Sequence, residues 1–417
     1  MKENYYFDNA ATTWPKPESV YRFMDSFFRS HGVNPGRSGS LQAVEAEQMI
    51  FGTRKLLAQF FGFSGDPNRV VFTQNATDSL NMSLSGLLQQ GDHVIISRMD
   101  HNAVLRPINH LQRDLGIEVT SLDPDASGLI DPDLLESSIT AKTRAIVVNH
   151  GSNVIGIVQD IKTIASIARS RSVPLIVDSA QTAGVLDIDM SCGIDILTFT
   201  GHKGLFGPMG IGGMVVADHV DLRSTRFGGT GVDSASRFQP EAYPHRLEAG
   251  TVSIPGIAGL HAAQKWFADK GREVAKLSAE ADHAITDHSS ACKLALRHIH
   301  QTEMEYANRI VRHLIEFPNV QMMGTQRTDG DAGPAVVQTD YVATHSFTVE
   351  NVDATQLAEM LDADYHICVR AGLQCAPDVH NFFSTASSGG SVRISPGYFT
   401  EDEDVDHLLD ALTQLLQ

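Results

Sequence analysis

The sequence predicts an α/β fold of three layers, in which a mostly parallel sheet lies between two layers of helices. Short runs of valine, isoleucine and leucine recur between residues 69 and 200, and amphipathic helical segments separate them. Such runs are typical of parallel strands that are buried on both faces, and the alternation is that of βαβ units. After about residue 258 the pattern changes to long helical segments and short strands, which predicts a second, smaller α+β domain.

The elements follow in a definite order along the chain. The strands predicted for the large sheet are 69–73, 92–97, 117–122, 144–150, 173–178 and 195–200. Glycines and prolines after Lys203 then predict a loop without regular structure. A helical stretch over 258–317, with a break near Gly271, precedes three further strands at 344–350, 363–372 and 391–398. We predict a large domain over 15–257 and a small domain made of 1–14 and 258–417.

Composition excludes several classes of function. The formal charge of −18 argues against a nucleic-acid or anionic-membrane partner. No run of about 18 apolar residues is present, so no transmembrane helix is expected. The first 14 residues lack the apolar core of a signal peptide. Four scattered cysteines are too few for a disulfide framework, and a reducing, cytoplasmic location fits them best.

A group of histidines in the helical stretch raises the possibility of a metal site. The group consists of His283, His288, His298, His300 and His313. His298 and His300 are two residues apart and therefore point to different faces of a helix. This spacing favours a solvated helix face, and no metal is expected.

Polar residues cluster after the predicted strands of the large sheet. In an open parallel sheet, ligands bind outside the carboxyl ends of the strands. The residues that follow those ends include Asn75, Ala76, Thr77, Asp100, His101, Asn153, Asp178, Gln181, Thr200, His202 and Lys203. Taken singly, Thr77 and Asp178 read as helix caps, Lys203 as a surface lysine and His101 as a structural histidine.

Together these residues form the set that pyridoxal phosphate requires. Its phosphate binds at a helix N-terminus with hydroxyl donors, and its pyridine nitrogen pairs with a carboxylate. Its aldehyde forms a Schiff base with a lysine amine, and its ring stacks on a flat side chain. The sequence therefore predicts a pyridoxal-phosphate site at this edge of the sheet.

Eight motifs in order give the chain a family resemblance. They are YFDNAATT, TQNATDSLN, DHNAVLRP, NHGSNVIGIVQDI, IVDSAQTAG, TFTGHKGLFGPMGIGG, RLEAGT and VRAGLQCAP. In this order they resemble the class V aminotransferases, specifically the cysteine desulfurases related to NifS and SufS. The resemblance covers nearly the whole chain and is weakest over 275–305. It implies fold type I of the pyridoxal-phosphate enzymes.

The resemblance also implies roles for the polar residues at this edge of the sheet. Lys203 matches the Schiff-base lysine, Asp178 the partner of the pyridine nitrogen, and His101 the imidazole that stacks on the ring and assists proton transfer. Gln181 and Asn153 match neighbours of the phenolic oxygen. The residues that match phosphate contacts are Ala76, Thr77, Thr200 and His202.

Three more matches concern the substrate and a second subunit. Arg393 matches the arginine that binds the substrate carboxylate, a task that suits a guanidinium fork. Arg37 and Asn153 fall near the mouth of the substrate site. Thr251 matches a residue that reaches the phosphate of the other subunit, which implies a homodimer.

Cys375 is the cysteine that the sequence most strongly indicates to be reactive. It lies in a loop with Gly372 and Pro377, and Arg370 nearby would favour its thiolate. It also matches the catalytic cysteine of the family. By contrast, the cysteines predicted to be small buried hydrophobes are Cys192, Cys292 and Cys368.

The residues before Cys375 differ from the SufS-like branch of the family. That branch has two histidines there, whereas this chain has Leu373 and Gln374. His380 either supplies an imidazole instead or lies on the surface.

The activity implied by the resemblance is conversion of L-cysteine to L-alanine, with a persulfide on Cys375 for transfer to an acceptor protein. A selenocysteine lyase, or a lyase for another cysteine-derived C–S bond, remains open. A class V aminotransferase or epimerase would not need Cys375. An inactive regulatory scaffold would not need Lys203, Asp178, His101 and Arg393 together.

Overall fold

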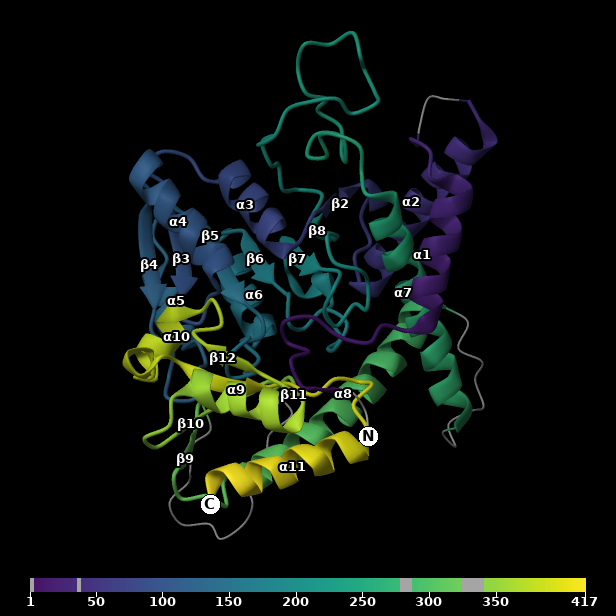
Figure 1. Cartoon of the computed structure of the whole chain (residues 1–417). Coiled ribbons are helices and arrows are strands. Elements are labelled where there is room, and N and C mark those ends of the chain that lie inside the picture. Colours follow the sequence, from purple (N-terminus) through teal and green to yellow (C-terminus); the bar gives the residue numbers. More distant parts are fainter. Residues whose placement is uncertain (1–3, 36–38, 278–286, 325–340) are drawn as a thin grey trace.

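The computed structural model describes residues 4–35, 39–277, 287–324 and 341–417, and Figure 1 shows its elements. Its large sheet has seven strands. In spatial order they are β2 (Val70–Thr73), β8 (Gly212–Val216), β7 (Ile196–Thr200), β6 (Leu175–Asp178), β5 (Thr143–Asn149), β3 (His93–Ser97) and β4 (Glu118–Leu122). Strand β8 runs antiparallel to both β2 and β7, and the other neighbours are parallel. The mostly parallel sheet predicted from the sequence is therefore confirmed.

Strand β8 corrects the expectation of a purely irregular segment after Lys203. Its first two residues are glycines, which sequence patterns count as breakers. A Cβ atom on Gly212 would collide with the backbone of Asn75, and one on Gly213 would collide with the ring of Phe199. The glycines therefore permit close packing of β8 inside the sheet.

Helices cover both faces of the large sheet. Along β5, Ile146 and Val148 pack into the hydrophobic cluster on one face, whereas Ala145 and Val147 pack into the cluster on the other. The first cluster includes residues of α2 (Leu41–Phe60), α5 (Pro132–Ser138), α6 (Ile161–Ser170), α7 (Ile254–Leu277) and α8 (His288–Leu314). The second includes residues of α3 (Ala76–Leu87) and α4 (Asn102–Leu115). Helix α1 (Glu18–His31) packs on α7.

The predicted break near Gly271 is wrong, because α7 stays helical through that residue. Gly271 is buried where α7 meets α8, and a Cβ atom there would collide with the carbonyl oxygen of Ala291. The glycine is thus required by helix–helix contact rather than by a turn.

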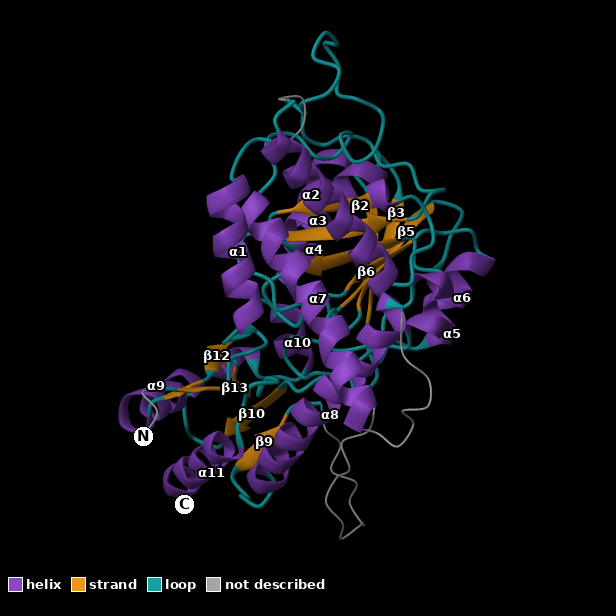
Figure 2. Cartoon of the chain, turned by 90° about the vertical axis from the view of Figure 1, so that its right-hand side faces the viewer, coloured by secondary structure: helices purple, strands orange, loops and turns teal. Residues whose placement is uncertain are grey.

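A second, smaller sheet lies apart from the first (Figure 2). Its antiparallel strands, in spatial order, are β12 (Arg370–Gly372), β13 (Ser391–Ile394), β10 (His345–Val349) and β9 (Val320–Met322). Helices α9 (Ala354–Tyr365) and α11 (Asp402–Leu416) contribute to its hydrophobic cluster, and α10 (Pro377–Phe382) follows β12. Short 3₁₀ helices occupy Pro67–Arg69, Met190–Cys192 and Ala386–Ser388.

The strand predicted over 363–372 is only partly correct. Helix α9 continues to Tyr365, and His366 ends it in a left-handed conformation with φ of 57°. Two strands in different sheets follow, since β11 (Ile367–Cys368) pairs with β1 (Tyr5–Tyr6) while β12 joins the four-stranded sheet. The strand predicted over 391–398 ends at Ile394.

The N-terminal segment lies with the C-terminal part of the chain. Besides the β1–β11 pair, Asp8 forms an isolated bridge with Ser395, and Phe7 belongs to the cluster of the smaller sheet. The assignment of residues 1–14 to the small domain stays a prediction, because Ala10 and Thr13 also bond Gln181 and His202 of the large domain. The proposed boundary between residues 257 and 258 stays a prediction, and α7 beyond it packs on α1 and α2.

The histidines of α8 are not a solvated face. His288, His298, His300 and His313 are all half-buried, and three of them lie within hydrogen-bonding distance of other side chains or carbonyl groups. His283 lies outside the described residues. Among the residues that the structure describes, no group of three histidine, cysteine or acidic side chains is placed to hold a metal ion. No helix in these ranges is long and apolar enough to cross a membrane.

Candidate active site

A cavity of about 380 Å³ lies at the carboxyl ends of β5, β6 and β7. Most of the residues predicted to act together line it, namely Ala76, Thr77, His101, Asn153, Asp178, Gln181, Thr200, His202, Lys203, Cys375 and Arg393. Ala10 and Asn149, to which the sequence analysis gave no role, also line it, together with Asn75, Arg370 and Gln374.

Strand order explains why these side chains meet. Lys203 follows β7, Asp178 ends β6, Asn153 follows β5 and His101 follows β3. These four strands are consecutive neighbours in the sheet. Because the strands are parallel, their carboxyl ends bring all four side chains to one edge.

The half-buried Lys203 and the buried Asp178 lie close enough for each to shift the pKa of the other. Burial lowers the pKa of Lys203 to about 8, and the nearby Asp178 carboxylate opposes part of that change. Burial raises the pKa of Asp178, whereas a 2.9 Å hydrogen bond from the backbone N–H of Ala180 and the charge of Lys203 lower it. A substantial fraction of Lys203 is therefore a neutral, nucleophilic amine near neutral pH.

His101 is held as a neutral imidazole at the start of α4. Its Nδ1 accepts a 3.0 Å hydrogen bond from the backbone N–H of Ala103, so the proton of the neutral ring resides on Nε2. Burial lowers its pKa to about 4, and the charges of Lys203, Arg106 and Arg393 act in the same direction. The ring can therefore stack on a flat ligand without carrying a charge.

The start of α3 offers unused hydrogen-bonding groups to the cavity. Asn75, not Thr77, caps this helix, because its side chain accepts a 2.9 Å hydrogen bond from the N–H of Asp78. The first N–H groups of a helix have no acceptor inside it. In the same cavity, the buried Oγ1 of Thr200 and Nδ1 of His202 have no hydrogen-bond partner in the described part of the chain. This set of unsatisfied groups suits an anion such as a phosphate.

Arg393, on β13 of the smaller sheet, lines the same cavity. Its Nη1 donates to the carbonyl of Asn153 at 2.8 Å, and its Nη2 donates to Oδ1 of Asp8 at 2.7 Å. Its Nε and the side-chain oxygen of Asn153 are buried without partners among the described residues. These groups can bind a carboxylate and an amine of a small substrate.

Asp8 is a site residue that the sequence analysis missed. Its second oxygen accepts hydrogen bonds of 3.0 and 2.7 Å from Nε and Nη2 of Arg370. Arg370 is therefore held by a carboxylate, and it is not a free cation beside Cys375 as the sequence had suggested. The signal that could have identified Asp8 is its place in the YFDNAATT motif, which carries part of the family resemblance.

Cys375 sits in a tight and well-anchored turn. Gln374 and Cys375 have φ angles of 41° and 59°, a left-handed conformation that non-glycine residues seldom adopt. The carbonyl of Gln374 accepts a 2.7 Å bond from the side-chain amide of Asn153, and the carbonyl of Cys375 accepts a 2.8 Å bond from the N–H of Asn102. Strain of this kind persists only where surrounding bonds enforce it.

The side chain of Gln374 holds the same turn through two further hydrogen bonds. Its Nε2 donates to the carbonyl of Ser391 at 2.9 Å, and its Oε1 lies 2.6 Å from Nε2 of His380. His380 is fully buried, so the surface alternative for this residue is wrong. Because its other ring nitrogen bonds Thr385, the imidazole supports Gln374 and does not face Cys375.

The four cysteines differ in their exposure. Cys375 is exposed, Cys292 is buried, and Cys192 and Cys368 are half-buried. Only Cys292 fully matches the prediction of a small buried hydrophobe.

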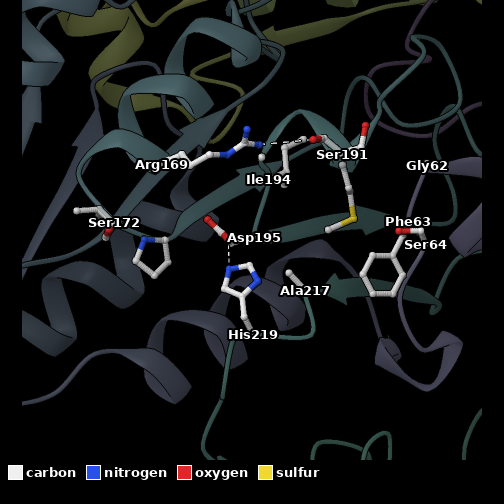
Figure 3. Close-up of a pocket in the computed structure, with 14 residues that line it drawn as sticks. Gly62, Phe63, Ser64, Arg169, Ser172, Ser191, Ile194, Asp195, Ala217 and His219 are labelled. Carbon is white, nitrogen blue, oxygen red and sulfur yellow. Dashed lines mark hydrogen bonds and ion pairs between the residues drawn. The ribbon is translucent and has the colours of Figure 1, made fainter.

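Two predicted site residues are not found among those that line the cavity, for different reasons. Thr251 is exposed and does not line it, and Arg37 lies outside the described residues. A larger cavity, of about 480 Å³, opens at the opposite edge of the sheet (Figure 3). It contains a 2.7 Å contact between His219 and Asp195 but none of the predicted site residues.

Comparison with known proteins identifies the family. The model of the family described as Aminotransferase class-V matches residues 5–289 and 287–408. The chain belongs to this family. A probable cysteine desulfurase of Pseudomonas putida is 30% identical over 423 residues, which cover 99% of this chain and 94% of that protein. A probable cysteine desulfurase of Methanothermobacter thermautotrophicus is 28% identical, with 100% and 95% covered.

Solved structures agree with the fold of this class V chain. The apo structure of a cysteine desulfurase from Thermococcus onnurineus NA1 superimposes with a TM-score of 0.84 and 26% identity, covering 99% of this chain and 95% of that one. The cysteine desulfurase CsdA from Escherichia coli gives a TM-score of 0.80 and 27% identity, covering 100% and 96%. The recognised family and the fold class are thereby confirmed.

Proposed function

We propose that this class V protein is a pyridoxal-phosphate-dependent cysteine desulfurase, which converts L-cysteine to L-alanine and leaves a persulfide on Cys375. The observation that carries this proposal is that an exposed cysteine and a half-buried lysine of lowered pKa line one cavity. The names of the relatives and of the similar solved structures support the same activity.

The residues of the cavity fit the cofactor. The first N–H groups of α3, the hydroxyls of Thr77 and Thr200 and the ring of His202 would hold its phosphate. Asp178 would pair with the pyridine nitrogen, His101 would cover the ring, Gln181 would lie at its edge, and Lys203 would bind the aldehyde. When bound, pyridoxal phosphate withdraws electrons from the α-carbon of an attached amino acid.

The chain's own residues then divide the work. Arg393 binds the substrate carboxylate, and the side-chain oxygen of Asn153 accepts a hydrogen bond from the substrate amine, so the two residues fix the orientation of the substrate. Lys203 accepts the α-proton, a role that suits an amine with a pKa of about 8. The thiolate of Cys375 attacks the substrate sulfur, so an S–S bond forms as the C–S bond breaks. The carbon fragment keeps the electron pair of the C–S bond, takes up protons and leaves as alanine.

The test is a pair of matched cysteine variants of the holoenzyme. Cys375→Ser should lose sulfide release from L-cysteine while retaining cofactor, since a serine hydroxyl is almost never ionised at neutral pH. Cys368→Ser, outside the cavity, should keep both properties. Mass spectrometry of the wild type should find the persulfide on Cys375. If Cys375→Ser kept wild-type turnover, a lyase that needs no protein nucleophile would replace this proposal.

A homodimer also belongs to this proposal. Thr251 is exposed in the single chain and lies outside its own cavity, as a residue that serves a second subunit would. Helices α1 and α2 expose the large apolar side chains of Phe28, Leu41, Val44 and Phe51, which supports an association surface. Light scattering that found an active monomer would contradict the dimer.

We propose a cytoplasmic location and a sulfur-acceptor protein as partner on chemical grounds. All four cysteines are free thiols, as in a reducing compartment. A persulfide on an exposed cysteine needs a second thiol to remove its sulfur. Fractionation of cells and identification of proteins that carry transferred sulfur would test both points.

A further inference from the structure

A further cavity, of about 520 Å³, is also lined by Cys375. Its lining comes from Cys375 and from the facing sides of α3 and α4. Four residues line both cavities, namely Thr77, His101, Ala103 and Cys375. Cys375 thus stands at the junction between the cofactor cavity and a groove, which we call the α3–α4 groove.

The α3–α4 groove is lined by both polar and apolar side chains, which suits a polypeptide segment. One wall consists of Thr77, Asn81 and Ser85, which follow one another by single turns of α3. Along α4, Pro107 and Leu111 add apolar contacts, while Arg106 and His110 add polar groups. Alternating apolar and hydrogen-bonding surfaces suit a polypeptide segment better than a small apolar ligand.

The anchored turn means that Cys375 cannot carry sulfur far from the cavity. The carbonyls of Gln374 and Cys375 are bonded to Asn153 and Asn102, which belong to the rim of the large sheet. Moving the thiol outward would break both bonds. The acceptor thiol must therefore come to Cys375, and the groove is the route that reaches it.

One positive charge in the groove, that of Arg106, acts on His101 at the junction of the two cavities and has no counter-ion among the described residues. Arg106 is exposed and forms no ion pair with any residue in the described ranges. Farther along the groove, Arg113 is paired with Asp114 and also bonds His110. The end of the groove that contains the cysteine is therefore positive, although the chain carries a formal charge of −18.

We propose that the α3–α4 groove binds an extended segment of the sulfur-acceptor protein, in which a cysteine is flanked by a carboxylate that pairs with Arg106. This inference rests on the proposed desulfurase function. The acceptor thiolate attacks the outer sulfur of the Cys375 persulfide, and a new S–S bond forms. The bond between the two sulfurs of the persulfide breaks, and its electron pair leaves on the Cys375 thiolate. The proton of the acceptor thiol passes to water, and no oxidant or reductant is needed.

The experiment measures persulfide discharge with defined thiols. Holoenzyme is loaded by L-cysteine, freed of small molecules, and mixed with one of three probes at ~0.15 M salt, where exposed charges more than about 8 Å apart are screened. The probes are a hexapeptide whose single cysteine is flanked by aspartates, the same peptide with lysines, and dithiothreitol. Mass spectrometry gives the rate of sulfur transfer to each probe.

Three variants separate the groove from the rest of the site. Asn81→Trp fills the groove from an exposed position and should lower the ratio of aspartate-peptide to dithiothreitol transfer about tenfold. Arg106→Glu should reverse the preference between the aspartate and lysine peptides. Asn109→Trp, at an exposed α4 position outside the groove, should leave every ratio unchanged.

The possible outcomes separate a failure of the groove proposal from a failure of the proposed desulfurase function. If the persulfide forms but Asn81→Trp and Arg106→Glu leave the ratios of transfer rates between the probes unchanged, the groove proposal alone is wrong. The absence of a persulfide on Cys375 in the wild type would overturn the desulfurase function and the groove with it. If Asn81→Trp instead changed the oligomeric state in light scattering, a second copy of the chain would be the occupant, and the acceptor proposal would be wrong.

Discussion

Asp8 and Arg393 form a buried ion pair at the candidate active site, with Oδ1 and Nη2 2.7 Å apart and each side chain only 4% exposed. Asp8 belongs to the N-terminal segment, whereas Arg393 lies on β13 near the other end of the chain. The carboxylate fixes the guanidinium plane at the wall of the cavity. Asp8 is therefore a positioning residue for the proposed substrate-binding arginine.

Asp8→Asn should weaken binding of L-cysteine more than it slows the chemical step. An amide cannot hold Arg393 by charge, so the guanidinium would be less well oriented toward the substrate carboxylate. We expect KM to rise about tenfold, equivalent to ~1.4 kcal/mol, with a much smaller change in kcat. Asp131→Asn, at the exposed cap of α5, is the matched control. Equal losses in kcat and kcat/KM would contradict a positioning role.

Uptake of the cofactor by the apoprotein should depend on pH with a midpoint near 8. Burial lowers the pKa of Lys203 to about 8, and only the neutral amine above that pKa can attack an aldehyde. At pH 7.5 about a quarter of the lysine would be neutral, against roughly 0.1% for an ordinary lysine. The association rate, followed by absorbance, should therefore rise from pH 6.5 and level off above pH 9. A rate still rising steeply at pH 10 would show an unperturbed lysine.

The sequence correctly predicted the fold, and which side chains meet at one edge of the sheet, where the local residue pattern itself reflects the function. Apolar strands followed by polar residues predicted the parallel sheet and the edge at which Lys203, Asp178 and His101 meet. Glycine was misleading, since Gly212 and Gly271 read as breakers but lie within a strand and a helix. Both positions need glycine because a segment distant in the sequence packs closely against them. The local sequence pattern carries no information about such a contact.

Long-range partners were likewise beyond prediction. Asp8 and Arg393 are separated by 385 positions, and nothing near either residue indicates the other. The same is true of the support that Gln374 receives from His380, because the sequence does not show that the histidine is buried. Both pairs form within the smaller sheet and the segments packed around it, where the folded chain rather than the local sequence brings the partners together.

Glu248→Ala should destabilise the fold. Glu248, in the RLEAGT motif, makes two 2.7 Å contacts with Arg54 of α2 and accepts a third from the N–H of Phe72. Removing it would leave a buried guanidinium without its counter-ion, a change that costs about 3–5 kcal/mol. Urea denaturation should show this loss. Asp221→Asn, which removes the exposed partner of Arg246, should cost far less, and similar losses for both would contradict the argument.

Glu303→Gln should stabilise the protein at alkaline pH and flatten the pH dependence of unfolding. Glu303 is buried in α8, and burial raises its pKa from 4.5 to about 8, opposed only by a hydrogen bond from the N–H of Tyr398. Below pH 4.5 the carboxyl is protonated in both the folded and the unfolded chain. Between about 4.5 and 8 only the folded chain holds this proton, so this group's contribution to the free energy of unfolding falls as pH rises.

The measurement is the melting temperature of the holoenzyme and of Glu303→Gln between pH 5 and 8.5. Glutamine keeps the shape of the protonated side chain without its ionisation, so the difference in melting temperature between variant and wild type should grow as pH rises. Glu305→Gln, an exposed neighbour on the same helix, should produce no such trend. If the Glu303→Gln difference stayed constant across this range, Glu303 would have to be ionised in the folded protein throughout, and a cation would have to lie beside it.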